Sequence, residues 1–224
     1  MNQDALFLRD EGDAWYRRNR EHLPPPDVAG EQEDVAFLSD ALSPFRDRIV
    51  RVLEIGCSSG IKLEALCDRL AARGDGIEPS RMAVDEGNAR IKSVDIRLQV
   101  GTGERLPFEA ATFDLIHFGF CLYLFGRESL MQSLAEADRV LRPGGFLAIT
   151  DFDPGLRQKR RYTHREGVFS AKQDYSDIYT SSGLYYLMAK HSFSHRRPFF
   201  DEDPGERVST SILFKEVDGY PVVS

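Results

Sequence analysis

Apolar positions follow two alternating patterns along the middle of the chain. Short apolar runs predict strands that end at Glu54 and Glu78, and further strands at residues 96–100, 113–118 and 146–151. Between them, apolar spacings of three and four predict helices, with inward positions Leu63, Leu66 and Leu70, then Val84, Gly87 and Ile91, then Leu130, Leu134, Ala137 and Leu141. Strands that alternate with helices predict an α/β fold with a parallel, doubly wound sheet.

The two ends of the chain depart from this alternation. Three prolines at residues 24–26 separate an N-terminal arm, residues 1–30, from a helix with apolar positions Val35, Leu38, Leu42 and Phe45. Residues 153–183 lack apolar periodicity and form an insertion, whereas residues 184–193 and 208–214 alternate as two more strands. At 224 residues, the chain is long enough for one such domain, which we place at residues 31–224.

The turn after the first strand contains the most informative chemistry. Glu54 ends the strand, and Gly56 and Gly60 bound a turn that leads into a helix. Such a turn brings backbone N–H groups and the positive end of a helix close to a ligand. A dinucleotide site would have a glycine where Ser58 stands, and its pyrophosphate would be repelled by Glu54. S-adenosylmethionine instead carries an ammonium and a sulfonium, so Glu54 favours that cofactor. A tight turn without a ligand is the structural alternative.

A second acid ends the next strand. Glu78 lies 22 positions after Gly56, a spacing that suits a carboxylate on the hydroxyls of a ribose. A nicotinamide enzyme would show the same acid, and a solvated charge at a strand end is the simpler interpretation. Glu78 therefore indicates a ribose without choosing the cofactor.

Further motifs identify a family. A Leu-Pro-Phe segment ends at Phe108, Phe113 and Asp114 open the fourth strand, and Leu-Arg-Pro-Gly-Gly precedes the fifth. Together with the glycine turn and Glu78, these motifs resemble the class I S-adenosylmethionine-dependent methyltransferases with small-molecule acceptors, over about residues 50–152. The resemblance implies a Rossmann-like, mostly parallel seven-stranded sheet whose last strand is antiparallel. Residues 184–193 and 208–214 would be its final pair.

The resemblance also implies roles for individual residues. The cofactor site would comprise Glu54, Gly56, Cys57 and Gly60 at the methionine end, Glu78 and Pro79 at the ribose, Thr102, Gly103 and Glu104 at the adenine, and Phe118 and Gly119 beside the sulfonium. Many relatives have Asp in place of Thr102, so the chain departs from the family at the adenine contact.

The N-terminal segment has a family likeness of its own. Residues 11–19 resemble the start of bacterial methylases linked to surface-sugar pathways. Trp15, Arg18 and Asn19 would then form a lid over the cofactor. An amphipathic helix that docks on the core is the structural alternative.

Methyl transfer is an in-line displacement, in which the enzyme mainly holds the acceptor and the methyl group in line. A neutral hydroxyl or an ammonium acceptor needs a base, whereas a phosphate, carboxylate or phenolate does not. The candidate bases are Asp151, with Asp153 beside it after the fifth strand, His164 and Tyr123. A structural role is an equal alternative for each of them. His117 lies inside a strand, and we interpret it as a packed histidine.

The insertion at 153–183 is rich in cations within an acidic chain. Five of them fall within nine positions, namely Arg157, Lys159, Arg160, Arg161 and Arg165. With His164, Lys172 and Tyr175, some of these would bind an anionic acceptor such as a sugar phosphate or a nucleotide sugar. Arg160, Arg161, Lys172 and Tyr175 are the chosen candidates, and a solvated loop is the alternative.

The bulk composition excludes several classes of protein. A net charge of −7 gives no general attraction to nucleic acid or to anionic membranes, although tRNA stacked on Tyr162 remains a minor alternative. The three cysteines lack metal-ligand spacing, so we expect no metal, and a reducing cytoplasm suits them. No apolar run is long enough to span a bilayer.

Two alternatives to a methyltransferase remain open. Tyr186 and Lys190 have the spacing of the catalytic pair in NAD(P)-dependent short-chain dehydrogenases, although the segment alternates like a strand. A non-enzymatic protein that binds S-adenosylmethionine and acts as a partner would also keep both acids and the glycine turn.

Overall fold

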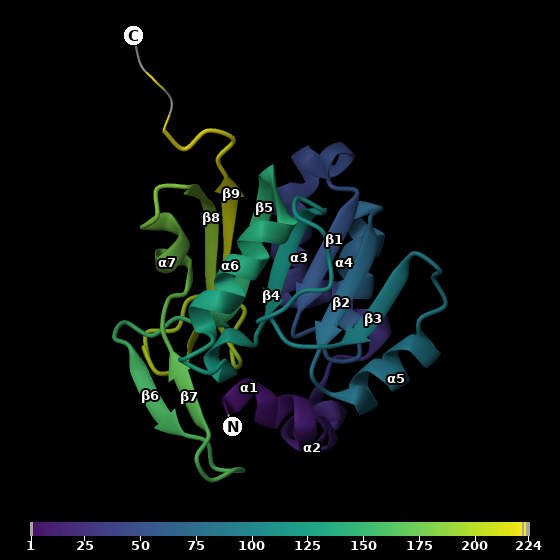
Figure 1. Cartoon of the computed structure of the whole chain (residues 1–224), viewed down its shortest axis with the longest axis vertical. Coiled ribbons are helices and arrows are strands. Elements are labelled where there is room, and N and C mark those ends of the chain that lie inside the picture. Colours follow the sequence, from purple (N-terminus) through teal and green to yellow (C-terminus); the bar gives the residue numbers. More distant parts are fainter. Residues whose placement is uncertain (1, 221, 223–224) are drawn as a thin grey trace.

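The computed structural model describes residues 2–220 and 222, and a seven-stranded sheet forms its centre (Figure 1). The strand order is β3-β2-β1-β4-β5-β9-β8. The strands are β1 (Arg51–Ile55), β2 (Arg73–Glu78), β3 (Ile96–Val100), β4 (Phe113–Gly119), β5 (Leu141–Phe152), β8 (Tyr185–Ser194) and β9 (Arg207–Lys215). Strands β1 to β5 pair in parallel, and β9 is antiparallel to both β5 and β8. The predicted doubly wound, mostly parallel sheet with an antiparallel last strand is therefore confirmed.

Helices cover both faces of the sheet. One apolar cluster joins the sheet to α3 (Glu33–Leu42), α4 (Ile61–Leu70) and α5 (Arg81–Arg90). The other joins it to α6 (Leu130–Val140) and to the segment that contains α7 (Ser176–Thr180). Short helical turns connect these elements, namely η4 (Ser43–Arg48) after α3 and η5 (Leu122–Leu124) after β4. The three layers place the carboxyl ends of β1, β2 and β4 along one edge of the sheet.

One predicted boundary is wrong. The sequence predicts a helix that includes Leu141 and a strand that starts at residue 146, but α6 ends at Val140 and β5 starts at Leu141. Leu141 pairs with Phe113 of β4, and the register shifts before Leu115 pairs with Phe146. Because Leu141 pairs with a strand residue, it belongs to β5 and not to α6. Residues 143–145 form the irregular stretch of β5 between the two parts of this pairing.

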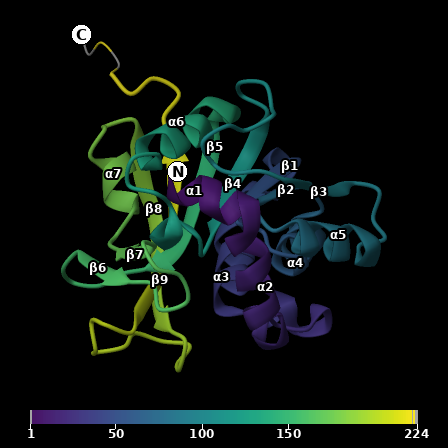
Figure 2. The same cartoon turned by 60° about the horizontal axis from the view of Figure 1, so that its bottom comes forward.

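The N-terminal arm lies across the carboxyl edge of the sheet, in front of the strands in Figure 2. It consists of α1 (Gln3–Leu6), the π-helical turn η1 (Phe7–Glu11), α2 (Gly12–Asn19), η2 (Arg20–His22) and η3 (Pro26–Glu31). The Gln3 amide bonds to the backbone of Leu124 and of Phe169. The Asp13 carboxylate accepts from Ser80 Oγ at 2.7 Å and from Met82 N at 3.0 Å. The arm is therefore fixed to the body at its start and near its middle.

The insertion at 153–183 contains regular structure that the sequence did not predict. β6 (Gln158–Arg161) and β7 (Phe169–Lys172) form a two-stranded antiparallel sheet beside the arm (Figure 1), and α7 follows. The residues of β6 are mostly exposed, so that strand has no apolar face for a sequence pattern to reveal.

Candidate functional site

The glycine turn joins β1 to α4 through residues in the left-handed region of backbone conformation. Gly56, Ser58 and Gly60 have φ angles of 78°, 50° and 72°. A Cβ atom on Gly56 would lie 2.5 Å from Cβ of Cys121, so only glycine permits this approach between the turn and the segment after β4. Gly60 is the N-cap of α4. The turn thus brings the start of a helix to the sheet edge.

A cavity of about 340 Å³ opens beside this turn. Its wall contains most of the residues that the sequence assigned to a cofactor, namely Trp15, Glu54, Gly56, Cys57, Glu78, Pro79, Thr102, Gly103 and Gly119. These residues come from the arm, from the ends of β1, β2 and β4, and from the segment after β3. The fold therefore brings together positions more than 100 residues apart in one concave site.

Glu54 is buried in this wall, with only one carboxylate oxygen paired. Its Oε1 lies 3.3 Å from Nδ1 of His117. Its Oε2 is buried and has no hydrogen-bond partner among the described residues. A Cβ on Gly119 would lie 2.5 Å from Oε1, so Gly119 makes room for the carboxylate. A buried carboxylate oxygen without a donor is costly, which makes this position suited to a cationic ligand.

Glu78 is also buried, but backbone groups hold both of its oxygens. Oε2 accepts from Ser58 N and Oε1 accepts from Ser80 N, each at 2.9 Å. Burial raises the pKa of Glu78 to about 7, although these two N–H groups oppose the shift. Each oxygen keeps a further lone pair for a ligand hydroxyl.

The remaining cofactor candidates lie outside the cavity wall. Phe118 is fully buried against Phe125, and Glu104 accepts from the Asn2 amide of the arm at 3.1 Å. Arg18 bonds to Glu11 at 2.6 Å and to the Tyr162 hydroxyl at 2.8 Å, and the Asn19 amide bonds to the Trp15 carbonyl oxygen. Gly60 serves as the cap of α4. Only Trp15 of the three predicted lid residues faces the cavity.

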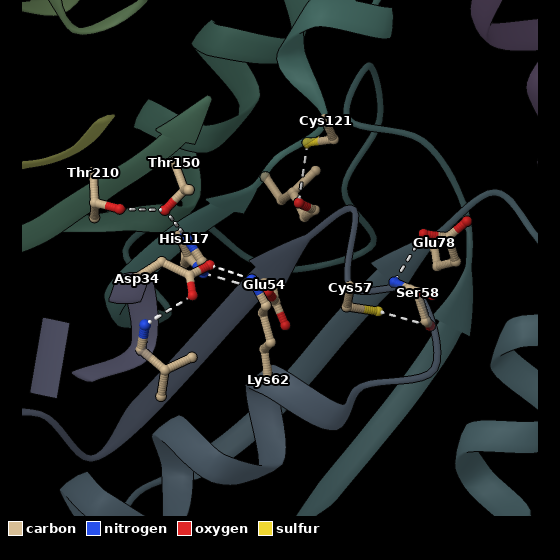
Figure 3. A network of polar contacts seen from close by, with 12 residues as sticks. Asp34, Glu54, Cys57, Ser58, Lys62, Glu78, His117, Cys121, Thr150 and Thr210 are labelled. Atoms are coloured by element: carbon tan, nitrogen blue, oxygen red, sulfur yellow. Dashed lines mark hydrogen bonds and ion pairs between the residues drawn. The ribbon is translucent and has the colours of Figure 1, made fainter. Parts of the chain in front are cut away.

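His117 is packed in the sheet as predicted, and it also joins polar groups in a row (Figure 3). Its Nε2 lies 2.9 Å from Thr150 Oγ1, which lies 2.9 Å from Thr210 Oγ1. This arrangement connects Glu54 at the cavity to the centre of the sheet.

The three candidate bases lie away from the cavity. Asp151 is buried, its Oδ2 accepts from Tyr123 N at 3.1 Å, and its Oδ1 accepts from Phe152 N at 2.7 Å. Burial raises the pKa of Asp151 to about 7 and also raises the pKa of the Tyr123 hydroxyl. Tyr123 packs against Phe120 and Phe152, and His164 is exposed beside Tyr162. In the structure, Asp151 therefore binds backbone N–H groups of residues 123 and 152.

The acceptor candidates of the insertion are dispersed. Arg160 and Arg161 are exposed on β6. The Tyr175 hydroxyl is buried and donates to backbone carbonyl oxygens of the neighbouring segments, and Lys172 Nζ lies 3.3 Å from the centre of the Phe152 ring. None of these four residues lines the cavity beside the glycine turn, and the structure does not bring them together.

A second cavity, of about 380 Å³, lies next to the first. The two share the wall residues Gln32, Lys62, Phe120 and His195. Arg196 and Arg197 also line the second cavity, from the segment that follows β8. These residues were not predicted from the sequence, although β8 runs parallel to β1 and the segment after it must lie at the carboxyl edge.

His195 stands between the two cavities. Its ring contacts Phe120 and Phe152, with ring centres 5.1 Å and 5.9 Å apart. Partial burial lowers the pKa of His195, as do the charges of Lys172 and Lys62, whereas Glu206 opposes the shift. The imidazole is therefore neutral at pH 7 and able to accept a proton.

Tyr186 and Lys190 both lie on β8, and neither lines the first or the second cavity. Lys190 Nζ is paired with Asp153 at 2.9 Å and with Asp174 at 2.6 Å. Within residues 2–220 and 222, no cluster of His, Cys, Asp and Glu side chains is arranged to hold a metal ion. No helix in the same part of the chain is long and apolar enough to cross a membrane.

Comparison with known proteins gives a family match for the centre of the chain. Residues 52–145 match a family described as "Methyltransferase domain". A demethylmenaquinone methyltransferase of Deinococcus radiodurans is 32% identical over 107 residues, which are 46% of this chain and 44% of that protein. An uncharacterised methyltransferase of Synechocystis is 31% identical over 139 residues, 61% of this chain and 62% of that protein. The chain covers less than two thirds of the length of either relative.

A solved structure resembles nearly the whole chain. It is the 1,6-didemethyltoxoflavin-N1-methyltransferase of Burkholderia thailandensis, with 1,6-didemethyltoxoflavin and S-adenosylhomocysteine bound. The TM-score is 0.72 at 16% identity, over 95% of this chain and 88% of that one. At this identity the likeness shows that the two share the Rossmann-like methyltransferase fold.

Proposed function

We propose that this protein is an S-adenosylmethionine-dependent methyltransferase that acts on a small, anionic acceptor. The observation that carries the proposal is the buried Oε2 of Glu54, which lacks a partner among the described residues at the wall of the first cavity. An ammonium group is the ligand that this oxygen needs, and a pyrophosphate is the ligand that it repels. The methyltransferase match over residues 52–145 agrees with this choice.

Residues of the first cavity fit the parts of the cofactor. Glu54 would bind the ammonium, Glu78 would accept from the ribose hydroxyls, and Thr102 and Gly103 would lie along the adenine. Trp15 would cover the cofactor from the arm. When bound, the cofactor supplies an electrophilic methyl group on a sulfonium. This chain would hold the acceptor in line with that group and exclude water from it.

The second cavity suits the acceptor. It adjoins the first through Phe120 and His195. Its wall contains three cations, Lys62, Arg196 and Arg197, beside the carboxylates of Glu33 and Asp34. Lys62 is paired with Asp34 at 2.5 Å, and Arg196 with Glu206 at 3.5 Å. These groups support an acceptor with a phosphate or carboxylate group, such as a sugar phosphate or a nucleotide sugar.

His195 is the base that the geometry favours over Asp151, Tyr123 and His164, because it alone of the four lines both cavities. A hydroxyl acceptor would give its proton to the neutral imidazole of His195. A phosphate or carboxylate acceptor would need no base.

Calorimetric titration tests the cofactor. We expect the protein to bind S-adenosylhomocysteine and to bind neither NAD nor NADP. The substitution Glu54→Gln should weaken S-adenosylhomocysteine binding by about 1.5 to 3 kcal/mol, because it removes a charged partner of the ammonium. Glu64→Gln is the matched control and should leave binding unchanged. Glu64 lies on α4, the helix that follows the glycine turn, and is paired with Arg90.

Binding of NAD or NADP in place of S-adenosylhomocysteine would refute the assignment of S-adenosylmethionine as the cofactor. A labelled-methyl assay with sugar phosphates, nucleotide sugars and their neutral counterparts then tests the acceptor. We expect label in the anionic compounds only. Cofactor binding without label in any compound of the panel would favour the alternative of a non-enzymatic partner protein.

A further inference from the structure

Four buried polar side chains form a row across the middle of the sheet (Figure 3). Glu54 on β1, His117 on β4, Thr150 on β5 and Thr210 on β9 are each at most 2% exposed. The steps between them measure 3.3, 2.9 and 2.9 Å. Glu54 and His117 are direct neighbours in the parallel register, as Thr150 and Thr210 are in the antiparallel one. The strand pairing therefore fixes the order of the row.

The chemistry of these groups gives the row a direction. An ionised carboxylate only accepts hydrogen bonds, so Nδ1 of His117 must carry the proton that faces Glu54. Nε2 of a neutral imidazole then accepts, so the Thr150 hydroxyl donates to it. Thr150 Oγ1 in turn accepts from the Thr210 hydroxyl. The two threonines thus fix the imidazole tautomer that donates to Glu54.

This arrangement occupies one oxygen of Glu54, and the other is buried without a hydrogen-bond partner among the described residues. Oε1 is held between His117 and the Cα of Gly119, where no Cβ would fit. The nearby Asp34 carboxylate is paired with Lys62. A glutamate side chain has considerable rotamer freedom, and ordering it before a ligand arrives removes a cost from binding.

We propose that His117 is a positioning residue, which orients the Glu54 carboxylate so that Oε2 receives the ammonium of the cofactor's amino-acid end. The inference rests on the proposed function. The buried row would then take part in ligand recognition. Substitutions in the row should weaken only ligands that carry the amino-acid end.

Two probe ligands separate this role from a general structural one. S-adenosylhomocysteine contains the amino-acid end, whereas 5′-methylthioadenosine has the same nucleoside and lacks that end. In His117→Leu, which removes both ring nitrogens, we expect S-adenosylhomocysteine to bind about tenfold to a hundredfold more weakly. The affinity for 5′-methylthioadenosine should stay within about twofold, because Glu54 does not contact it.

Two milder variants keep the test decisive if His117→Leu does not fold. His117→Asn keeps an N–H donor near the position of Nδ1, so it should retain most of the affinity for S-adenosylhomocysteine. Thr150→Val removes the donor that fixes the tautomer, and should weaken S-adenosylhomocysteine by about threefold to tenfold while sparing 5′-methylthioadenosine. His191→Asn is the matched control, since His191 is a strand histidine that lines neither cavity, and its Nε2 lies 3.4 Å from Glu33 Oε2.

A thermodynamic cycle with Glu54→Gln completes the experiment. If His117 acts through Glu54, then His117→Asn and Thr150→Val should change the ratio of the two affinities far less in the Glu54→Gln background. Equal losses for both ligands, or an unchanged affinity for S-adenosylhomocysteine in folded His117→Leu or Thr150→Val, would overturn the inference alone. Failure of the unsubstituted protein to bind S-adenosylhomocysteine would overturn the proposed function and the inference together.

Discussion

Two carboxylates at the ends of adjacent strands differ in how their oxygens are used. Glu54 has one oxygen held by a side chain and one without a partner among the described residues, which suits a cation. Glu78 has both oxygens held by backbone N–H groups, which suits hydroxyl donors. The difference arises because Glu54 faces a histidine on the next strand, whereas Glu78 faces the backbone of residues 58 and 80 at the glycine turn and the start of α5.

The raised pKa of Glu78, about 7, predicts that cofactor affinity depends on pH. Below this pH the carboxyl group carries a proton and accepts ribose hydrogen bonds poorly. If only the ionised form binds, the affinity for S-adenosylhomocysteine should rise about tenfold between pH 6 and pH 8. Calorimetry in buffers across this range measures it.

Two variants of Glu78 provide the comparison. Glu78→Gln should bind more weakly at pH 8 and should show no such rise. Glu78→Ala should lose about 1 to 3 kcal/mol of binding free energy at pH 8, the range for lost hydrogen bonds to a charged partner. A pH dependence that persists in Glu78→Gln would assign the rise to another group.

At the scale of elements, the N-terminal arm is the part that shapes the site from outside the sheet. Its α2 helix starts at Gly12, which lies against the backbone of Pro79 and Ser80, next to Glu78. A Cβ on Gly12 would lie 2.8 Å from the Phe7 carbonyl oxygen within the arm, 3.0 Å from Ser80 N and 3.1 Å from the carbonyl carbon of Pro79. This close approach brings Trp15, one turn further along, to the cavity.

The contact at Gly12 opposes the usual effect of a helix substitution. Replacing glycine by alanine inside a helix ordinarily stabilises by about 0.5 to 1 kcal/mol. Here we expect Gly12→Ala to destabilise the protein by at least about 1 kcal/mol, because neither backbone segment can move without displacing the other. Hydrogen exchange should become faster in residues 3–19, and S-adenosylhomocysteine should dissociate faster.

Gly155→Ala is the control, because an added Cβ there has only the Arg207 guanidinium near it, at 3.9 Å. A Gly12→Ala variant that is more stable than the unsubstituted protein would show that the arm does not pack tightly on the turn before α5.

The elements that could be predicted from the sequence are those with a local repeat of apolar residues. The strands β1 to β5, β8 and β9 are all present near the predicted positions because each has an apolar face or run that repeats at short range. The hairpin of β6 and β7 was not predicted, because β6 is mostly exposed and carries no apolar repeat. The start of β5 was misplaced because Leu141 fits either the face of α6 or a pair with Phe113.

The same distinction applies to the site. Glu54 and Glu78 were found because a strand end and a glycine turn are local signals. His195 was missed because its place depends on the return of β8 to the carboxyl edge of the sheet. Arg18 was placed at the cofactor by its sequence neighbourhood, whereas its hydrogen-bond partner Tyr162 lies 144 positions further along the chain.

At the scale of the whole molecule, buried carboxyl groups connect stability to pH. Burial raises the pKa of Asp151 from 3.8 to about 7, so the folded state holds a proton that the unfolded state releases. The stabilisation from this group is fully present below about pH 4 and is lost as the pH rises through 7. Glu78 acts in the same direction.

The substitution Asp151→Asn removes this titration. Between pH 5 and pH 8, the unfolding free energy of the unsubstituted protein should fall relative to that of Asp151→Asn by on the order of 2 kcal/mol. Urea unfolding at the two pH values measures the difference. Asp153→Asn, next in the chain but paired with Lys190, is the control, and parallel pH profiles for the unsubstituted protein and Asp151→Asn would contradict the assignment.

The strand order of the sheet has a consequence for how the chain is synthesised. β9 lies between β5 and β8, so β8 leaves the ribosome before β9, the strand with which it pairs in the main sheet. Until residues 207–215 emerge, β5 presents an open edge and the segment of β8 has no partner strand there. Unpaired strand edges bind other chains readily. We therefore expect the nascent protein to be most in need of chaperones during the translation of its last segment, after most of the sheet has formed.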